Sequence, residues 1–217
     1  MRRQFRAVCR AVVLVLLAAW PAGFLLQAAK PALKITAPAD GTLVYSGRTF
    51  SIEVEADPSA FQAVGVVGQA PLGWTDGLSA PPYRFTLKTP PDFPSGVYKL
   101  TAMGVTRSGD QVQSQPVTID VEQSDNPKQL LAELSTISFG QVGEESALVI
   151  TGVFSDGTRV GLSHSTRTRY SSSARSVVVV RADGVAKAVG PGFAKITVMH
   201  GPLTLVIPVA VPSEKQP

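Results

Sequence analysis

The residues best suited to do chemistry lie in the run Gly161-Leu162-Ser163-His164-Ser165. A Gly-x-Ser-x-Gly run forms a nucleophile elbow where a strand meets a sharp turn and a helix, because that turn exposes the serine hydroxyl. Here a serine replaces the final glycine, and short strands rather than a helix are expected on both sides. A hydrolase with Ser163 as its nucleophile is therefore kept only as a remote alternative.

Other catalytic patterns are weaker still. His164 and His200, the two histidines, are far apart in the chain, and we expect both at surface loops or strand ends. Glu53 and Glu55 share one face of an expected strand, as a glycosidase pair could, but two acids on a wet strand are ordinarily solvated surface. The sequence contains no helical His-Glu-x-x-His, phosphate loop or dinucleotide-binding glycine pattern. We predict that the protein is not an enzyme and needs no cofactor.

One stretch has the oxygen ligands that calcium prefers. Glu122, Asp125 and Asn126 lie at an expected domain junction, and hard cations take carboxylate and amide oxygens. Three such oxygens are too few for a complete calcium shell, and Asp-Asn-Pro is also an ordinary turn sequence. We predict no metal site, and keep these three residues as the calcium candidates.

Ligand or partner contact is the remaining class of chemistry. Trp74 is the candidate aromatic platform, because exposed tryptophan rings stack on sugars or pack at interfaces; the alternative is that it covers one open end of a sandwich. Arg167, Arg169 and Arg181 belong to an arginine set that could meet an anionic group, or simply form a solvated face. Phe193 is a further candidate contact for a partner.

The elements that must position these residues are short strands. In the first half, Phe50, Ile52, Val54 and Ala56 alternate with polar residues, which predicts a strand with one wet face. Strand-like runs and turn dipeptides recur at steady intervals, and no window has a useful helical period. The pattern predicts an all-β protein built from sandwiches.

The second half repeats this pattern. Asp156-Gly157 and Asp183-Gly184 suit tight hairpins, because glycine takes a positive φ without a Cβ clash. Ala194 begins a strand whose alternate residues are expected to face inward. Tyr170 is expected in the core with Thr166 and Thr168 on its face, which would direct Arg167 and Arg169 to solvent.

Residues 1–29 resemble an export signal peptide. Four arginines precede an unbroken apolar run, and small residues Ala28 and Ala29 offer a cleavage site. The alternative is a retained membrane anchor, although Pro21 and Gly23 interrupt the apolar segment. We expect an exported protein that is periplasmic, at the cell surface or secreted, with membrane contact only if this segment stays uncleaved.

Charge and cysteine content narrow the partners. The formal net charge is +4, but four of the 20 Lys and Arg residues lie in the signal, which leaves 16 bases against 16 acids. A chain without excess positive charge gives no case for nucleic-acid binding. The single cysteine, Cys9, also lies in the signal. The mature chain therefore has no disulfide and depends on packed cores.

Residues 30–122 resemble a bacterial immunoglobulin-like domain of the kind found in secreted and surface proteins. The motifs that carry the resemblance are Pro38-Ala39-Asp40-Gly41, Pro82-Tyr83-Arg84-Phe85, Gly96-Val97-Tyr98-Lys99-Leu100-Thr101-Ala102 and Ser114-Gln115-Pro116-Val117. Residues 123–127 follow as a short polar linker that Pro127 stiffens.

Residues 128–212 are similar to the bacterial Ig-like group 2 domain known from intimin and invasin-type adhesins, and residues 213–217 form a tail. The motifs are Ser155-Asp156-Gly157-Thr158, Tyr170-Ser171-Ser172, Ala182-Asp183-Gly184-Val185, Ala188-Val189-Gly190-Pro191-Gly192 and Ala194-Lys195-Ile196-Thr197-Val198. The resemblance implies two tandem immunoglobulin-like β-sandwiches and a non-catalytic adhesion-type module that engages a protein or glycan at the cell envelope. The alternative is a structural spacer or assembly subunit.

Overall fold

The computed structural model describes residues 31–213. The expected export segment, residues 1–29, lies outside the described residues, as do residues 214–217 of the tail. The described residues 31–213 fall within a single contact unit that contains both halves of the chain. Within residues 31–213 no helix has the length and apolar character that a membrane crossing needs.

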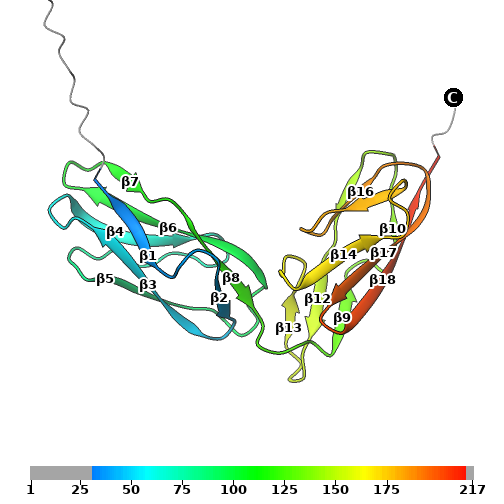
Figure 1. Ribbon diagram of the computed structural model, residues 1–217, viewed down its shortest axis with the longest axis horizontal. Helices are drawn as coiled ribbons and strands as arrows, with labels where there is room; N and C mark the ends of the chain where they lie inside the picture. The colour runs from blue at the N-terminus through cyan, green and yellow to red at the C-terminus, as the bar shows by residue number, and fades with distance from the viewer. Residues whose placement is uncertain (1–30, 214–217) are drawn as a thin grey trace, which may run out of the picture. The chain divides into compact units, whose positions relative to one another are not determined.

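The first half of the described chain folds into two facing sheets (Figure 1). The first sheet has the order β1-β3-β5, with β1 at Leu33–Ala37, β3 at Thr49–Ala56 and β5 at Tyr83–Lys88. The second has the order β2-β8-β6-β4, and β7 also pairs with β6. Its strands are β2 (Thr42–Tyr45), β4 (Phe61–Gly68), β6 (Gly96–Thr106), β7 (Gln111–Gln113) and β8 (Val117–Glu122).

The second half forms one larger sheet and two small ones. The larger sheet has the order β10-β18-β17-β14, and the small sheets have the orders β13-β12-β9 and β11-β16-β15. The strands of the larger sheet are β10 (Ile137–Ser138), β14 (Thr168–Ser172), β17 (Gly192–His200) and β18 (Leu203–Val211). Those of the small sheets are β9 (Gln129–Ala132), β11 (Glu145–Ala147), β12 (Ile150–Val153), β13 (Arg159–Gly161), β15 (Val178–Val180) and β16 (Val185–Ala188).

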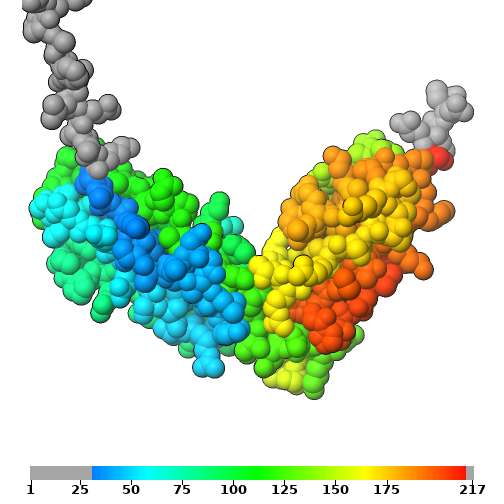
Figure 2. All heavy atoms as spheres, viewed as in Figure 1, coloured from blue at the N-terminus to red at the C-terminus, as the bar shows by residue number. Residues whose placement is uncertain are grey.

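The two halves are sequential in the chain. In Figure 2 the first half runs from blue to green and the second half from green to red. Each half has its own cluster of buried apolar side chains. The expectation of an all-β fold with two tandem sandwiches is therefore confirmed.

Alternation along the strands builds both cores. In β6 every second residue is buried, and Leu100 at its centre has no exposed surface. The Phe61 ring packs directly on the backbone of Gly104, where an added Cβ would lie 2.5 Å from the ring. In the second sandwich Ala194, Ile196 and Val198 face inward as the sequence predicts. Burial of such side chains is the main favourable contribution to folding.

A tyrosine near the start of β6 fixes the corner before that strand. The Tyr98 hydroxyl donates a hydrogen bond to the carbonyl oxygen of Pro94 at 2.8 Å, and its ring meets Phe93 edge-on at a centroid distance of 5.1 Å. A tyrosine whose hydroxyl bonds to the backbone a few residues upstream is a hallmark of immunoglobulin-type sandwiches. This contact supports the immunoglobulin-like architecture independently of sequence.

The Asp-Gly turns of the second sandwich form as expected. Gly157 and Gly184 have φ values of +86° and +80°. Tyr170 packs its ring against Gly184, where an added Cβ would lie 3.1 Å from the tyrosine hydroxyl oxygen. That hydroxyl donates to the carbonyl oxygen of Ser163 at 2.8 Å. Tyr170 is half-buried against the core, as predicted, and burial raises the pKa of its hydroxyl.

Candidate binding surface

Trp74 lies in the segment of residues 69–79 between β4 and β5, and the residue is 79% exposed. The segment is held to β4 by backbone and side-chain bonds. The amide of Thr75 donates to the carbonyl of Val66 at 2.9 Å, and the amide of Val66 donates to the Thr75 hydroxyl at 2.9 Å. The backbone that carries Trp74 is therefore fixed while its ring faces solvent.

The other side of the segment is anchored by an apolar contact. The amide of Gly68 donates to the carbonyl of Gly73 at 2.7 Å. Leu72 packs on Gly68 so closely that a Cβ there would lie 2.5 Å from the leucine Cβ. Leu72 also belongs to the margin of the first core. The structure does not support the alternative that Trp74 covers one end of the sandwich, because Leu72 is the residue that packs inward.

The register places Trp74 in a row across the outer face of the second sheet. Trp74 pairs with Val67 in an isolated antiparallel bridge, and Val67 pairs with Thr101 on β6. Directly opposite residues in an antiparallel pair project from the same face. Lys99 lies two residues along β6 on that face, and its carbonyl accepts from the Gln69 amide at 2.7 Å. We call these five residues the Trp74 face.

The chemistry of the Trp74 face suits recognition more than reaction. It combines an exposed indole ring and an aliphatic side chain with a hydroxyl, an amide and an ammonium group. Aromatic rings stack on sugar rings or pack at protein interfaces, while the polar groups beside them form hydrogen bonds.

Arg181, a predicted contact residue, is engaged within its own sandwich. Its guanidinium lies 3.1 Å from Asp183 and 3.5 Å from Glu145. The hydrogen bond to Asp183 raises the pKa of Arg181, and the same bond lowers the pKa of the Asp183 carboxyl. These groups are exposed, so the ion pairs are weak.

Arg169 and Phe193 share the larger sheet of the second sandwich but not one site. Arg169 lies on β14 opposite Met199, which is near the C-terminal end of β17. Phe193 lies near the N-terminal end of β17. Phe193 is 84% exposed. The structure therefore does not bring the predicted contact residues of the second sandwich together, and none of them joins Trp74 in the Trp74 face.

Glu122, a calcium candidate, is instead a buried hydrogen-bond acceptor. It is 2% exposed, and the Ser165 hydroxyl lies 2.8 and 2.9 Å from its two carboxylate oxygens. The amide of Thr166 donates to the same carboxylate at 2.9 Å. Both carboxylate oxygens of Glu122 therefore already accept hydrogen bonds from residues of the second sandwich.

The other two calcium candidates do not join Glu122. The Asn126 side-chain oxygen accepts a hydrogen bond from the Arg167 guanidinium, which also donates to the Gln123 carbonyl at 3.2 Å. Asp125 is exposed. Across residues 31–213 no three His, Cys, Asp or Glu side chains gather as a metal site would require. The expectation that Arg167 faces solvent is wrong, because Arg167 is half-buried against the linker.

Two further side chains complete this junction. The Thr166 hydroxyl lies 2.8 Å from an Asp120 carboxylate oxygen and 3.1 Å from Glu122. Burial raises the pKa of Asp120, and the nearby Glu122 charge raises it further, although the Thr166 bond opposes both. The expectation that Thr166 lies on the face of Tyr170 is wrong, because Thr166 sits in the loop before β14 and points to the first sandwich.

Ser163 has a structural task that the sequence does not reveal. Its hydroxyl oxygen accepts a hydrogen bond from the backbone amide of Ile150 at 2.8 Å. His164, beside it, is exposed. Strand β13 ends two residues earlier, and no helix follows within the described chain. This geometry lacks the strand–turn–helix that activates a nucleophilic serine.

The expectation that His200 lies at the surface is wrong. His200 is 1% exposed, because the alternation of β17 continues through its last residue. Its Nδ1 lies 2.9 Å from the Thr168 hydroxyl. Burial lowers the pKa of His200 to about 4, and the positive charge of Arg167 contributes to this lowering. The side chain is therefore neutral at neutral pH.

Glu53 and Glu55 lie on a strand surface next to cations. Glu53 forms an ion pair with Arg84 at 3.0 Å, and Glu55 is opposite Lys34 in the register. Neither acid is buried, and the two do not face a shared cavity within the described residues. The contacts are those of a solvated strand face.

Comparison with known proteins finds structural likeness without sequence likeness. No protein-family model matches the chain, and no curated protein matches it. The chain resembles the fibronectin(III)-like modules of Clostridium thermocellum CbhA at 18% identity and a TM-score of 0.36, over 42% of this chain and 94% of that one. It resembles S-layer protein SbsC domains 4 and 5 at 14% identity and a TM-score of 0.35, over 69% and 77% of the two chains.

A third similar structure belongs to an enzyme. The endo-beta-1,4-mannanase of Thermotoga petrophila overlaps 43% of this chain at 16% identity and a TM-score of 0.34, but the overlap spans only 20% of the mannanase. At these TM-scores none of the likenesses decides a function. The described chain is an all-β tandem of sandwiches, and the strand pairing and the Tyr98 corner establish this architecture directly.

Proposed function

We propose that the protein is an exported, non-catalytic binding module that engages a protein or glycan at the cell envelope. The observation that carries the proposal is Trp74, which is 79% exposed on a segment bonded to β4 and packed by Leu72. The resemblance of residues 128–212 to the group 2 Ig-like domain and the export signal in residues 1–29 are parts of this proposal.

The physical argument concerns preorganisation. A tryptophan ring on a fixed backbone loses little conformational freedom when a partner covers it, so its contact area contributes efficiently to affinity. Tryptophan is among the residues that most often dominate binding energy at interfaces. Thr101, Lys99 and Gln69 add hydrogen-bonding groups on the same face. This combination suits a sugar chain or a mixed polar and apolar protein surface.

Binding to cell envelopes and to a glycan array tests the proposal. We expect Trp74→Ala to weaken retention at least about tenfold, which corresponds to about 1.4 kcal/mol. Val206→Ala is the control, because it removes an apolar side chain that is 48% exposed on the other sandwich and has no proposed contact role. Equal retention of wild type and Trp74→Ala would refute the role of the Trp74 face. Failure of the wild type to bind either material would refute the binding module itself.

Export is tested separately on whole cells. Protease added outside intact cells should cleave a surface protein, whereas a periplasmic protein should be cleaved only after the outer membrane is opened. A protein recovered entirely from the cytosol, with residues 1–29 attached, would contradict export.

A second function, that of a structural spacer or assembly subunit, is favoured by the junction. Glu122 of the first sandwich accepts hydrogen bonds from Ser165 and Thr166 of the second, and Arg167 of the second donates to the Gln123 carbonyl in the linker. Glu122 and Arg167 are both at least half-buried. Such bonds would hold the two sandwiches at a fixed angle. Small-angle scattering of the protein and of Glu122→Ala tests this. A spacer is expected to show one narrow distance distribution that broadens in the variant, and a broad distribution in both would count against it.

A further inference from the structure

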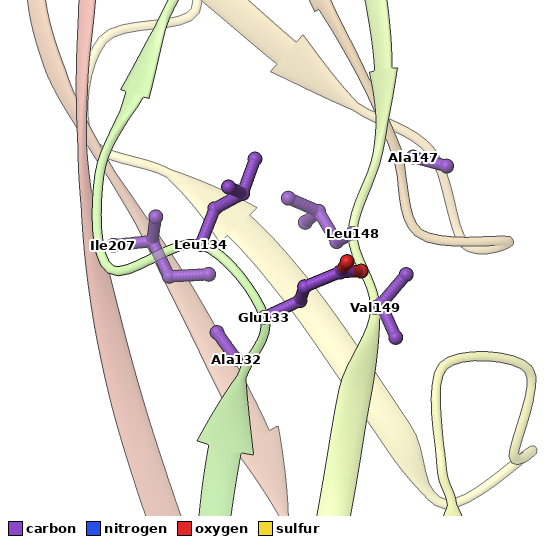
Figure 3. Close-up of a pocket in the computed structure, with 7 residues that line it drawn as sticks. All are labelled: Ala132, Glu133, Leu134, Ala147, Leu148, Val149 and Ile207. Atoms are coloured by element: carbon purple, nitrogen blue, oxygen red, sulfur yellow. The ribbon is translucent and has the colours of Figure 1, made fainter.

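A small pocket opens in the second sandwich beside the end of β9. Its volume is about 130 Å³, and its lining includes Glu133, Leu134, Leu148, Val149 and Ile207. Figure 3 shows Leu134 and Leu148 projecting into the space from the two sides, with Glu133 extending toward Val149. Ile207, on β18 of the opposite sheet, is 1% exposed, so the pocket reaches the margin of the core.

The pocket exists because one strand changes sheets. Strand β9 pairs with β12. The pairing extends by one hydrogen bond past the end of β9, from the Glu133 amide to the Val149 carbonyl at 3.1 Å. It then crosses over, and β10 pairs with β18 in the larger sheet. Strand β11, which continues β12 toward its N-terminal side, therefore lies at the edge of its own sheet.

The hydrogen-bond pattern shows which backbone groups face that edge. The Leu148 amide donates to the Gly184 carbonyl at 2.9 Å, and the Glu144 carbonyl accepts from the Ala188 amide at 2.9 Å. The even-numbered residues of this stretch therefore direct their backbone amides and carbonyls toward β16. Successive residues of a strand direct their backbone groups to opposite sides. Glu145 and Ala147 therefore present their amides and carbonyls to the open edge. An edge of this kind is a template for another strand.

The pocket by itself is smaller than a typical small-molecule site, although the hollow that adjoins it is larger. Pockets for small molecules commonly enclose about 300–1,000 Å³, whereas about 130 Å³ matches a single aliphatic or aromatic side chain. The apolar lining of Leu134, Leu148 and Ile207 favours such a side chain. A strand that pairs with β11 would place alternate side chains on the pocket side.

The carboxylate of Glu133 favours a basic side chain on the segment that binds here. Glu133 is exposed at the mouth of the pocket and forms no ion pair within residues 31–213. It also lines a second hollow, of about 460 Å³, that continues past Val149 toward Thr151. A lysine or arginine on the incoming strand would meet this carboxylate.

We propose that the open edge of β11 and the adjoining pocket bind an extended peptide segment of a partner protein. The segment adds a strand beside Glu145 and Ala147, inserts one apolar side chain between Leu134 and Leu148, and places a basic side chain against Glu133. Strand addition of this kind takes affinity from main-chain bonds and specificity from pockets for alternate side chains. The site is separate from the Trp74 face and does not depend on it.

The test uses octapeptide probes of the form Thr-Thr-Thr-X-Thr-Lys-Thr-Thr, in which X is Leu, Ile, Val or Phe. Titration into the 15N-labelled protein should shift the amide signals of Glu145 and Ala147. Replacing X by Asp should weaken the best probe at least tenfold. Methylation of the backbone nitrogens that face β11 should also weaken it at least tenfold, because pairing is then blocked while the side chains remain.

Protein variants separate the parts of the site. Glu133→Gln should weaken the lysine-bearing probe about three- to tenfold and leave a probe with threonine in place of lysine unchanged. Ala147→Pro, which removes an edge amide, should abolish the shifts. Trp74→Ala should bind the probes as the wild type does, so failure of the binding module proposed above would leave this result intact.

Three outcomes would overturn the proposal. The first is that none of the four probes shifts Glu145 or Ala147. The second is that the N-methylated probe binds as tightly as its parent, which would show apolar contact without strand pairing. The third is concentration-dependent self-association with the same amides at its interface, which would make a second copy of this chain the occupant.

Discussion

The carboxylate of Glu122, the last residue of β8, accepts a hydrogen bond from the hydroxyl of Ser165, which lies 43 positions later in the other sandwich. Glu122 and Ser165 are 2% and 3% exposed. A buried carboxylate is costly unless donors surround it, and here Thr166 supplies a backbone amide as well. The two sandwiches are therefore joined by a specific bonded contact in addition to the linker.

Glu122→Gln should lower the free energy of unfolding by about 1–3 kcal/mol, because an amide nitrogen then faces donors that need an acceptor. Urea unfolding followed by circular dichroism measures the change. Glu55→Gln, an exposed acid on β3, is the control and should change stability by less than about 0.5 kcal/mol. Equal small effects of both variants would show that the Glu122 bonds add no stability.

His200 should make stability depend on pH. Its pKa is about 4 in the folded state against 6.5 in the unfolded state, so the unfolded chain binds the proton more readily between these values. This contribution is complete above pH 6.5, is lost as the pH falls toward 4, and amounts to about 3 kcal/mol.

Replacing His200 isolates this effect. The raised pKa of Asp120 acts in the opposite direction, because protonation of this half-buried acid is easier in the folded state. Wild type and His200→Gln are therefore compared by urea unfolding at each pH from 7 to 4, and the wild type should lose more stability. His164→Gln changes an exposed histidine and should follow the wild-type curve. Parallel curves for all three proteins would contradict a buried neutral His200.

Tyr170 should contribute through its ring more than through its hydroxyl. Tyr170→Phe removes the bond to the Ser163 carbonyl and should cost about 0.5–1.5 kcal/mol. Tyr170→Ala also empties the space over Gly184 and should cost about 3–5 kcal/mol. Chemical denaturation of both variants checks the order. An unchanged midpoint for Tyr170→Ala would contradict the core position.

Variants of Trp74 and Leu72 should differ in their effect on the free energy of unfolding. Trp74→Ala should leave the free energy of unfolding within about 0.5 kcal/mol of wild type, because the ring is 79% exposed. Leu72→Ala removes the side chain that packs on Gly68 and should destabilise by about 1–3 kcal/mol. Thermal unfolding measures both. Marked destabilisation by Trp74→Ala would show that the indole is part of the packing and would weaken its role as a binding platform.

The regular parts of the fold follow from local patterns. Alternation predicts the strand at Ala194 and its inward residues, since side chains of a strand point alternately to its two faces. Asp-Gly dipeptides mark turns at Gly157 and Gly184, because a positive φ favours glycine. The same alternation, continued to His200, predicts that this residue is buried. The polar imidazole side chain led instead to the expectation of a surface position.

The contacts between segments cannot be read from the sequence. Ser165, which stands where a nucleophile elbow would have its final glycine, is the partner of Glu122, and nothing in the spacing of 43 residues marks that bond. The exposure of Trp74 depends on which residue of its hairpin, Trp74 or Leu72, turns inward.

By itself the sequence determined an all-β tandem, because strand periodicity and turn chemistry are local properties of the chain. Only the tertiary structure decided the junction, the outward face of Trp74 and the open edge of β11. Each of these depends on how distant strands are paired and where one strand leaves its sheet. Such pairings are set by packing across the whole sandwich, which the order of residues does not display.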